Sequence, residues 1–442
     1  MVVADLDVSR LLSREKIIGM APDHPTARGA DDLARSDKWG TCGWRVSTAD
    51  GDRIVWAEFP DGKRAPIRTT ATLPGMRLTC TCSALRFPCR HIIALLLRDD
   101  DRSIPSIALP EWADITAQDH LKDRQPGEPA GDDGRQSALV AGMADLQRWL
   151  GDLTGQGLAL LPKKNRALWL DAANRLVDAY AYDAARELRA LSLIPGSSAD
   201  WPERLLPRMG RLALLCEAFR RLDELSPAER GDALAAAGQL PPPDGSPVED
   251  DWLVMGHGTE IENRQLRART WLYGLSSRRW ALLSDSYTGG RLDGIHLPTG
   301  ATASGGLTFL PSAWPSAARP AAPLRLTASG LPADTLSTLT INGAIREYAA
   351  ALAANPWLAV FPVALGEVWI EPPGPAGTHW RLRDRGGWLL PLDESFAHGW
   401  RLLSLSADRP LSLFGEWDGA VFSPVSAFAG GWQAMSGWRG VA

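Results

Sequence analysis

The sequence predicts a multidomain α+β protein with three parts: a small β-plus-helix module, a helical bundle and a β-rich mixed C-terminal region. Three observations support this order. Cysteine and histidine cluster at residues 80–91, apolar residues recur at helical spacing between 138 and 240, and β-like runs dominate after residue 250. The 442 residues are enough for about two to four domains with substantial cores.

Composition limits the classes of protein that fit. Hydrophobic residues make up 45% of the chain and charged residues 22%, as in ordinary globular proteins, and a net charge of −5 gives no overall reason to expect nucleic acid. No apolar run approaches the roughly 20 residues of a membrane span, and the N-terminus lacks a signal-peptide core. Five cysteines without a disulfide-like pattern fit a reducing compartment, so we expect a cytoplasmic protein.

One twelve-residue stretch carries the strongest chemical signal: Cys80-Thr-Cys82-Ser-Ala-Leu-Arg-Phe-Pro-Cys89-Arg-His91. It holds three of the five cysteines and one of the seven histidines. Thiolates and an imidazole at such close spacing suit Zn²⁺, which takes four tetrahedral sulfur and nitrogen ligands in structural sites. Four protein ligands leave no position for water, so the stretch predicts one structural zinc ion.

The spacing of these residues also predicts local structure. Cys80 and Cys82 are two apart, so on an extended segment both side chains leave the same face, with Cα atoms about 6.6 Å apart. Their sulfurs must converge to about 3.8 Å on one metal, which indicates a bent strand end. Pro88 favours an extended residue before it, and Cys89 and His91 then fall at the start of a helix, whose N-terminus favours thiolate. The apolar run 92–97 supplies the buried side of that helix.

We place this finger, residues 78–98, in a first domain of residues 1–118. A short helix is expected at 8–18, and strands at 44–46 and 54–59 are separated by a turn at 49–52. A core that small gains much of its stability from the metal.

The pattern Cys-x-Cys-x6-Cys-x-His is the signature of the SWIM zinc finger, and its context is similar to one bacterial SWIM family. The resemblance rests on Trp39-Gly-Thr-Cys42-Gly-Trp44 and on Arg86-Phe-Pro-Cys89-Arg-His91, and more weakly on Asp251-Trp-Leu-Val254, Arg269-Thr-Trp-Leu272 and Gly415-Glu-Trp-Asp-Gly419. It implies Cys80, Cys82, Cys89 and His91 as zinc ligands. It also implies companionship with MoxR-type AAA+ ATPases and von Willebrand factor A proteins. SWIM fingers in general are regarded as DNA-binding or protein-interaction modules.

The middle of the chain is predicted to be helical. A polar, Pro- and Gly-rich linker is expected at residues 119–137, followed by a helical domain at 138–240. The first helical stripe steps by four and three residues through Leu139, Met143, Leu146, Leu150 and Leu153. Ser226, Pro227 and Glu229 have the form of a capping box that opens a further helix. Cys216 lies on an apolar stripe, which favours a core role over metal binding.

After a Pro-rich linker at 241–250, residues 251–442 form the predicted β-rich mixed domain. Strands are expected at 252–256, 265–273, 280–285, 324–328, 368–371, 380–383, 402–406 and 421–422, with one helix at 339–354. Twelve of the nineteen tryptophans lie in this region. They are interpreted as core and sheet packing or, alternatively, as a surface for a partner.

Basic residues around the finger leave a second function open. Residues 63–98 hold seven Lys and Arg and no Asp or Glu. One interpretation is a phosphate-binding patch for DNA or RNA, and the other is that Arg86 and Arg90 offset the charge of the thiolates. The candidate nucleic-acid contacts are Lys63, Arg64, Arg68, Arg77, Arg86 and Arg90.

Catalytic signatures are missing from the sequence. It has no Gly-x4-Gly-Lys-Ser/Thr phosphate loop, no His-Glu-x-x-His and no Gly-x-Ser-x-Gly elbow. His257, His296, His379 and His398 are scattered and are interpreted as surface or packing residues. We therefore expect a non-enzymatic adaptor that binds protein partners, with nucleic-acid binding as the alternative, and no membrane or small-molecule substrate.

Overall fold

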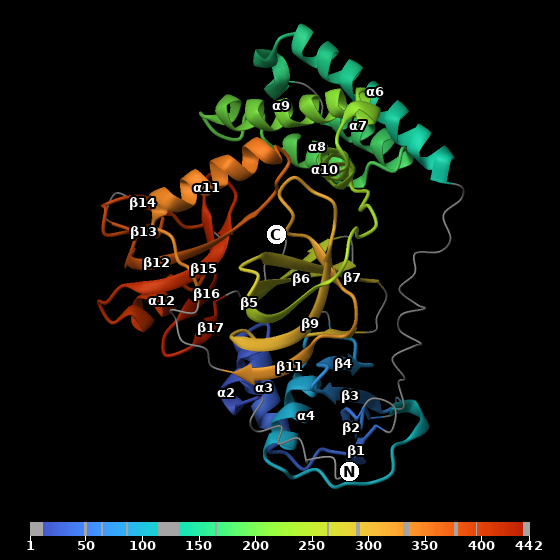
Figure 1. The fold of residues 1–442 in the computed structure, drawn as a ribbon, viewed down its shortest axis with the longest axis vertical. Coiled ribbons are helices and arrows are strands. Elements are labelled where there is room, and N and C mark those ends of the chain that lie inside the picture. Colours follow the sequence, from blue (N-terminus) through green and yellow to red (C-terminus); the bar gives the residue numbers. More distant parts are fainter. Residues whose placement is uncertain are drawn as a thin grey trace.

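The structure, a computed structural model, describes residues 12–47, 51–62, 65–84, 87–113, 132–163, 166–262, 265–288, 292–329, 336–374, 379–394 and 396–435. It is mixed α+β with three sheets and a helical bundle, as predicted. Figure 1 shows the bundle at one end of the molecule, two sheets below it, and the N-terminal module at the other end.

The N-terminal module is a small antiparallel sheet covered by helices. Ser13 caps the first helix by accepting a hydrogen bond from the Lys16 N–H, and Asp23 caps the second through Thr26. The first described helix begins at residue 14, and residues 8–11 of the predicted 8–18 helix lie outside the described part. The elements are α2 (Arg14–Gly19), α3 (His24–Ala34), β1 (Cys42–Val46), β2 (Arg53–Phe59), β3 (Ile67–Leu73), β4 (Arg77–Cys80), α4 (Arg90–Asp100) and η1 (Glu111–Ala113).

The bundle forms its own core from the apolar stripes that the sequence shows. Its N-terminal helix starts at residue 132, inside the stretch predicted as linker, whose residues 119–131 lie outside the described part. The capping box at Ser226 is present, with Ser226 and Glu229 each bonding the other's backbone N–H. The elements are α6 (Asp132–Gly155), η2 (Leu158–Lys163), α7 (Ala167–Asp178), α8 (Tyr182–Leu191), α9 (Trp201–Arg220), η3 (Leu222–Glu224) and α10 (Pro227–Ala237).

Cys216 is part of that core and does not belong to the cysteine and histidine cluster of the finger. Its side chain is buried among the apolar residues of the bundle, and burial raises the pKa of its thiol to about 12. None of the five cysteines forms a disulfide in the described chain.

The C-terminal region contributes strands to all three sheets. The second sheet has the order β10-β9-β5-β6-β7, with β11 also paired to β9, and the third has the order β14-β13-β12-β15-β16-β17. The elements are β5 (Val248–Glu262), β6 (Gln265–Gly274), β7 (Trp280–Thr288), β8 (Leu292–Ile295), β9 (Ala301–Phe309), β10 (Ala318–Pro320), β11 (Arg325–Ser329), α11 (Ile341–Ala354), β12 (Phe361–Glu371), β13 (Arg381–Arg383), β14 (Leu389–Pro391), α12 (Gly399–Ser406), β15 (Leu411–Trp417), β16 (Phe422–Phe428) and β17 (Trp432–Ala434).

One predicted strand was wrong. Residues 402–406 belong to helix α12, which buries Leu402 and Ser406 one turn apart. The Ser406 hydroxyl donates a hydrogen bond to the Leu403 carbonyl, which closes the last turn. A five-residue segment of Leu and Ser fits either period, so its helical state depends on packing against the third sheet. The predictions also missed β9 and β15, which are central in their sheets.

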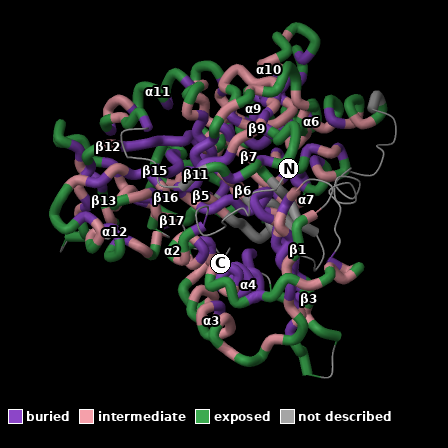
Figure 2. Tube along the Cα trace, turned by 60° about the horizontal axis from the view of Figure 1, so that its bottom comes forward, coloured by how far each residue is buried: buried purple, intermediate pink, exposed green. Residues whose placement is uncertain are grey.

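The first module and the second sheet share one hydrophobic core, which is the feature that positions the finger. Strand β8, from the C-terminal region, pairs antiparallel with β4 and places Leu292 opposite Cys80. The resulting five-stranded sheet has the order β1-β2-β3-β4-β8. Helix α4 is almost continuously buried (Figure 2), and its apolar residues belong to the same core as Trp252, Val254 and Leu272 of the second sheet. The domain boundaries expected from the sequence, 1–118 and 251–442, separate residues that pack together here.

Candidate metal centre

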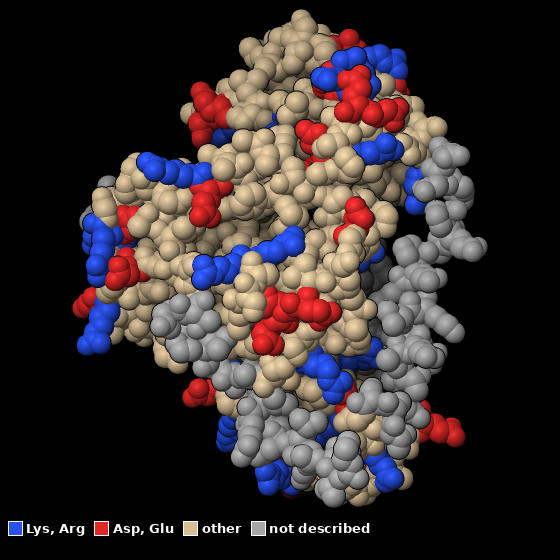
Figure 3. Space-filling model, in the orientation of Figure 1, with Lys and Arg blue, Asp and Glu red and all other residues tan. Residues whose placement is uncertain are grey.

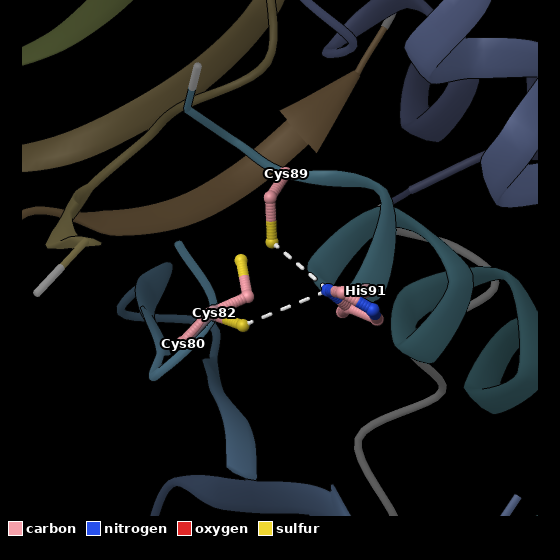
Figure 4. Close-up of side chains that lie close together, drawn as sticks. All are labelled: Cys80, Cys82, Cys89 and His91. Carbon is pink, nitrogen blue, oxygen red and sulfur yellow. Dashed lines mark hydrogen bonds between the residues drawn. The ribbon is translucent and has the colours of Figure 1, made fainter. Parts of the chain in front are cut away.

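Four side chains converge where β4 meets α4. Cys80 is the last residue of β4, Cys82 follows in the turn, Cys89 is the N-cap residue of α4, and His91 lies in its first turn. The Nδ1 atom of His91 is 4.0 Å from the Cys80 sulfur and 3.9 Å from the Cys89 sulfur. All four candidate ligand atoms lie within 4.8 Å of one another, and Figure 4 shows the three sulfurs and the imidazole gathered around one point. The bent strand end and the helix start predicted from the spacing are both present.

The site is closed to solvent. None of the four residues is more than 6% exposed, and the ring of Phe59 lies 4.9 Å from that of His91. Thiol and imidazole groups with four donors in a compact buried cluster fit Zn²⁺ in a structural site. These residues would hold the ion and would tie β4 to α4, with no coordination position left for a substrate.

Charge in the cluster also favours a cation. Hydrogen bonds from Cys80 and Cys89 lower the pKa of the Cys82 thiol, whereas hydrogen bonding to Cys82 and Cys89 raises the pKa of Cys80. A divalent ion would stabilise three thiolates together, because its charge offsets their mutual repulsion.

A second layer of side chains connects the finger to the second sheet. Phe87 packs edge-on against His296, with ring centroids 6.0 Å apart, and His296 stacks on His257 at 4.2 Å. The His257 Nδ1 atom lies 3.1 Å from the Thr270 hydroxyl on β6. His296 is buried and His257 is half-buried, and desolvation of the rings lowers the pKa of His257 to about 4 and holds that of His296 well below its usual value. Sequence reasoning treated the two histidines as unrelated, and no signal in their spacing predicts this stack.

The structure describes three of the six basic residues that were considered as contacts to phosphate, and Arg68 among them is paired with an acidic side chain. Arg68 bonds Glu58 of the neighbouring strand at 3.0 Å, an acid that lies outside the segment counted in the sequence. Arg77 lies on β4 and Arg90 is an exposed residue at the start of α4. Lys63, Arg64 and Arg86 fall outside the described residues. On the described part of the face in Figure 3, basic and acidic side chains are interspersed.

Comparison with protein-family models agrees with this geometry. The SWIM zinc finger model matches residues 71–100, from within β3 to the end of α4, and the SWIM-associated four-helix bundle domain matches residues 134–237. The chain contains a SWIM zinc finger and the four-helix bundle domain that is associated with it. No curated protein and no solved structure gives a significant match.

The bundle match coincides with the helical bundle, and the finger match covers part of the N-terminal module. The finger match contains all four clustered residues, and the bundle match runs from α6 to the last residue of α10. The described residues include no helix with both the length and the apolar character of a membrane span.

Proposed function

We propose that this SWIM protein is a non-enzymatic adaptor of the cytoplasm that holds one structural zinc ion and acts with a MoxR-type AAA+ ATPase and von Willebrand factor A proteins. The observation that carries the proposal is the closed ligand cluster, which stabilises a shared core and presents no open position for chemistry. The partner class follows from the sequence resemblance to bacterial SWIM proteins. The few cysteines, three of them in the metal cluster, give no disulfide framework and are consistent with the cytoplasm.

Two exposed tryptophans supply a candidate contact surface. Trp252 and Trp271 are fully buried core residues, as ordinary packing predicts. Trp388 and Trp400, by contrast, are 50% and 69% exposed. Trp400 lies at the start of α12 with its ring edge-on to Trp380, 5.0 Å away. Large aromatic side chains left in water are typical of binding hot spots, so we place the adaptor surface on the unit of the third sheet.

Affinity capture of the full chain from its native cell tests this function. We expect an AAA+ ATPase and a von Willebrand factor A protein to be recovered equally with and without nuclease. The double variant Trp388→Ala and Trp400→Ala should lose them, because it removes the exposed anchors without touching the zinc site. Leu160→Ala is the matched control, since it removes an apolar side chain of similar exposure from the bundle. Recovery of neither partner class, or full retention in the double variant, rejects the proposal.

Nucleic-acid binding is the second candidate, favoured by exposed Arg90 at the N-terminus of α4. A helix N-terminus and a guanidinium both attract phosphate. If this face binds DNA or RNA, affinity should fall steeply with salt, and the slope should flatten when Arg68, Arg77 and Arg90 become Ala. Lack of binding at low salt would eliminate this candidate.

A further inference from the structure

Lys16 of helix α2 lies at a contact between the zinc module and the loop that leads into β9. Its Nζ atom donates a hydrogen bond of 3.3 Å to the Gly300 carbonyl, 284 residues further along the chain. The Lys16 side chain is half-buried, so it belongs to an interface within the molecule and is still partly accessible to solvent. Neither the metal site nor the adaptor surface uses this amine.

The carbonyl that receives this hydrogen bond is held in a fixed position. Gly300 donates its own N–H to the Val254 carbonyl of β5 at 2.7 Å, and its φ of +76° is in the left-handed region that favours glycine. A Cβ atom on Gly300 would meet the backbone oxygen of Trp432 at 2.8 Å, so the loop packs closely against β17. The Lys16 amine is therefore anchored by a rigid acceptor.

No carboxylate neutralises the Lys16 amine in the described part of the chain. No Asp or Glu oxygen there lies within 4.0 Å of its Nζ atom, whereas Arg14 of the same helix is paired with both Asp31 and Asp101. Burial without an opposite charge disfavours the ammonium form. It lowers the pKa of Lys16 to about 8.

The protonation state of Lys16 decides its chemistry, because a neutral amine is a nucleophile and an ammonium group is not. At pH 8 an amine with a pKa of about 8 is roughly half neutral, against about 0.4% for an unperturbed lysine with a pKa of about 10.4. The hydrogen bond to Gly300 uses an N–H of Lys16, so the lone pair of the neutral nitrogen is left for another reaction.

From this geometry we propose that Lys16 is a site of acylation by small acyl thioesters. The lone pair of Nζ attacks the carbonyl carbon of the thioester, the C–N bond of an amide forms and the C–S bond breaks. Sulfur leaves as a thiolate, and the proton lost from nitrogen passes to water. The product keeps one N–H for the Gly300 carbonyl and loses its positive charge, so the contact between the zinc module and the second sheet is retained.

The composition of the chain makes this site easy to distinguish. Lysine occurs at only six positions, so a peptide map resolves them individually: Lys16, Lys38, Lys63, Lys122, Lys163 and Lys164. Lys38 is exposed and lies in the same module, which makes it the internal reference for an accessible lysine.

Acetylation of the full-length, zinc-loaded protein by acetyl-coenzyme A tests the proposal, with the rate at each lysine followed by mass spectrometry. The neutral fraction favours Lys16 over an unperturbed lysine by about a hundredfold at pH 8, and partial burial slows access to it. We therefore expect Lys16 to be acetylated about tenfold faster than Lys38. Its rate should level off above about pH 8 in the folded protein and keep rising through pH 9 in urea, where the burial is lost.

The matched variant is Lys16→Arg, which keeps a cationic donor for Gly300 and should leave the rate at Lys38 unchanged. Acetylation of Lys16 at the rate of Lys38 or more slowly, in the folded protein, would overturn the proposal. The same ratio of the two rates before and after unfolding would overturn it too, because the reactivity would then belong to the local sequence and not to the interface.

Discussion

The N-terminal zinc module and the helical bundle represent two ways of building a domain in one chain. The bundle packs the stripes of its own helices into a separate core. The zinc module has the stronger sequence motif, yet its core continues into the second sheet, and its sheet is completed by β8 from more than 200 residues away. A strong local motif therefore specifies a metal site without making the surrounding domain self-contained.

The connections of the two units to the rest of the molecule differ accordingly. Besides the β4–β8 ladder, the zinc module is joined by an ion pair of 2.6 Å between Asp52 and Arg325 and by a hydrogen bond from the Lys16 Nζ atom to the Gly300 carbonyl. The bundle is joined through one buried carboxylate, that of Asp232 on α10, together with a hydrogen bond from the Trp357 indole to the Arg211 carbonyl. The first connection is a continuous core, and the second combines these polar contacts with local packing of Trp357 against the bundle core.

The largest effect is expected from loss of the metal. Cys89→Ser, or chelation of the wild-type protein, should reduce zinc content from about one equivalent toward none and should remove much of the apparent 10–16 kcal/mol of binding energy typical of small zinc fingers. Because the core is shared, hydrogen exchange should accelerate in β4, α4, β8 and β5 and stay unchanged in the bundle. Cys42→Ala is the control and should retain its zinc. Equal acceleration in the bundle would show that the two units are not separate in stability.

The second-largest effect is expected when the bundle and the zinc module are produced as separate fragments. A fragment of residues 132–240 contains the whole bundle core and should fold cooperatively by circular dichroism and thermal melting. A fragment of residues 12–118 lacks β8 and the part of its core that the second sheet supplies. Its backbone amides should therefore be only partly protected from hydrogen exchange, even with zinc bound. A natively protected 12–118 fragment would contradict the shared-core interpretation.

Low pH should destabilise the zinc module and the core that it shares with the second sheet, because the stacked histidines His257 and His296 become protonated on unfolding. The pKa of His257 is lowered to about 4 by burial, and that of His296 is lowered too, so the unfolded chain binds more protons than the folded one between about pH 6.5 and 4. Stability is complete above the unfolded pKa and falls with decreasing pH, by up to about 1.4 kcal/mol per pH unit for each histidine.

The measurement is denaturant unfolding of the zinc module from pH 7 to 5. Protonation of the metal ligands also lowers the free energy of unfolding as the pH falls, and it does so in every protein compared. The informative quantity is therefore the difference between variants in how steeply the free energy of unfolding depends on pH. The free energy of unfolding of His296→Leu should fall less steeply with decreasing pH than that of the wild type. His379→Asn alters a half-exposed histidine on the third-sheet unit and should leave the decline unchanged. An unaltered slope in His296→Leu would remove the stack as a source of acid sensitivity.

The smallest effect is expected at the joint of the bundle. The Asp232 carboxylate accepts hydrogen bonds from the Ser312 hydroxyl at 2.5 Å, the Ala313 N–H at 2.9 Å and the Asn355 amide at 2.7 Å. Asp232→Ala leaves these donors without their acceptor and should cost about 1–3 kcal/mol. Hydrogen exchange should rise around residues 312–314 while zinc content and the bundle core are retained. Asp152→Ala, an exposed change on α6, should have no such effect.

Local regularities in the sequence predicted much of this molecule. Close ligand spacing brought Cys80, Cys82, Cys89 and His91 together as expected, because a strand end, a turn and a helix start leave little freedom over twelve residues. Helical stripes and the Ser226 capping box predicted the bundle for the same reason, since their partners lie within a few residues. The strand predicted at 402–406 was wrong because a segment of five Leu and Ser residues is too short to show a distinguishing period.

Sequence alone therefore determined the metal cluster, the α+β class and the bundle, all of which depend on contacts between near neighbours. Only the tertiary structure decided that β8 completes the finger sheet, that His257 and His296 stack beneath it, and that Asp232 holds the bundle in place. These contacts join residues that are between 39 and 218 positions apart. Their formation depends on how whole surfaces pack, and no local period or spacing records that packing.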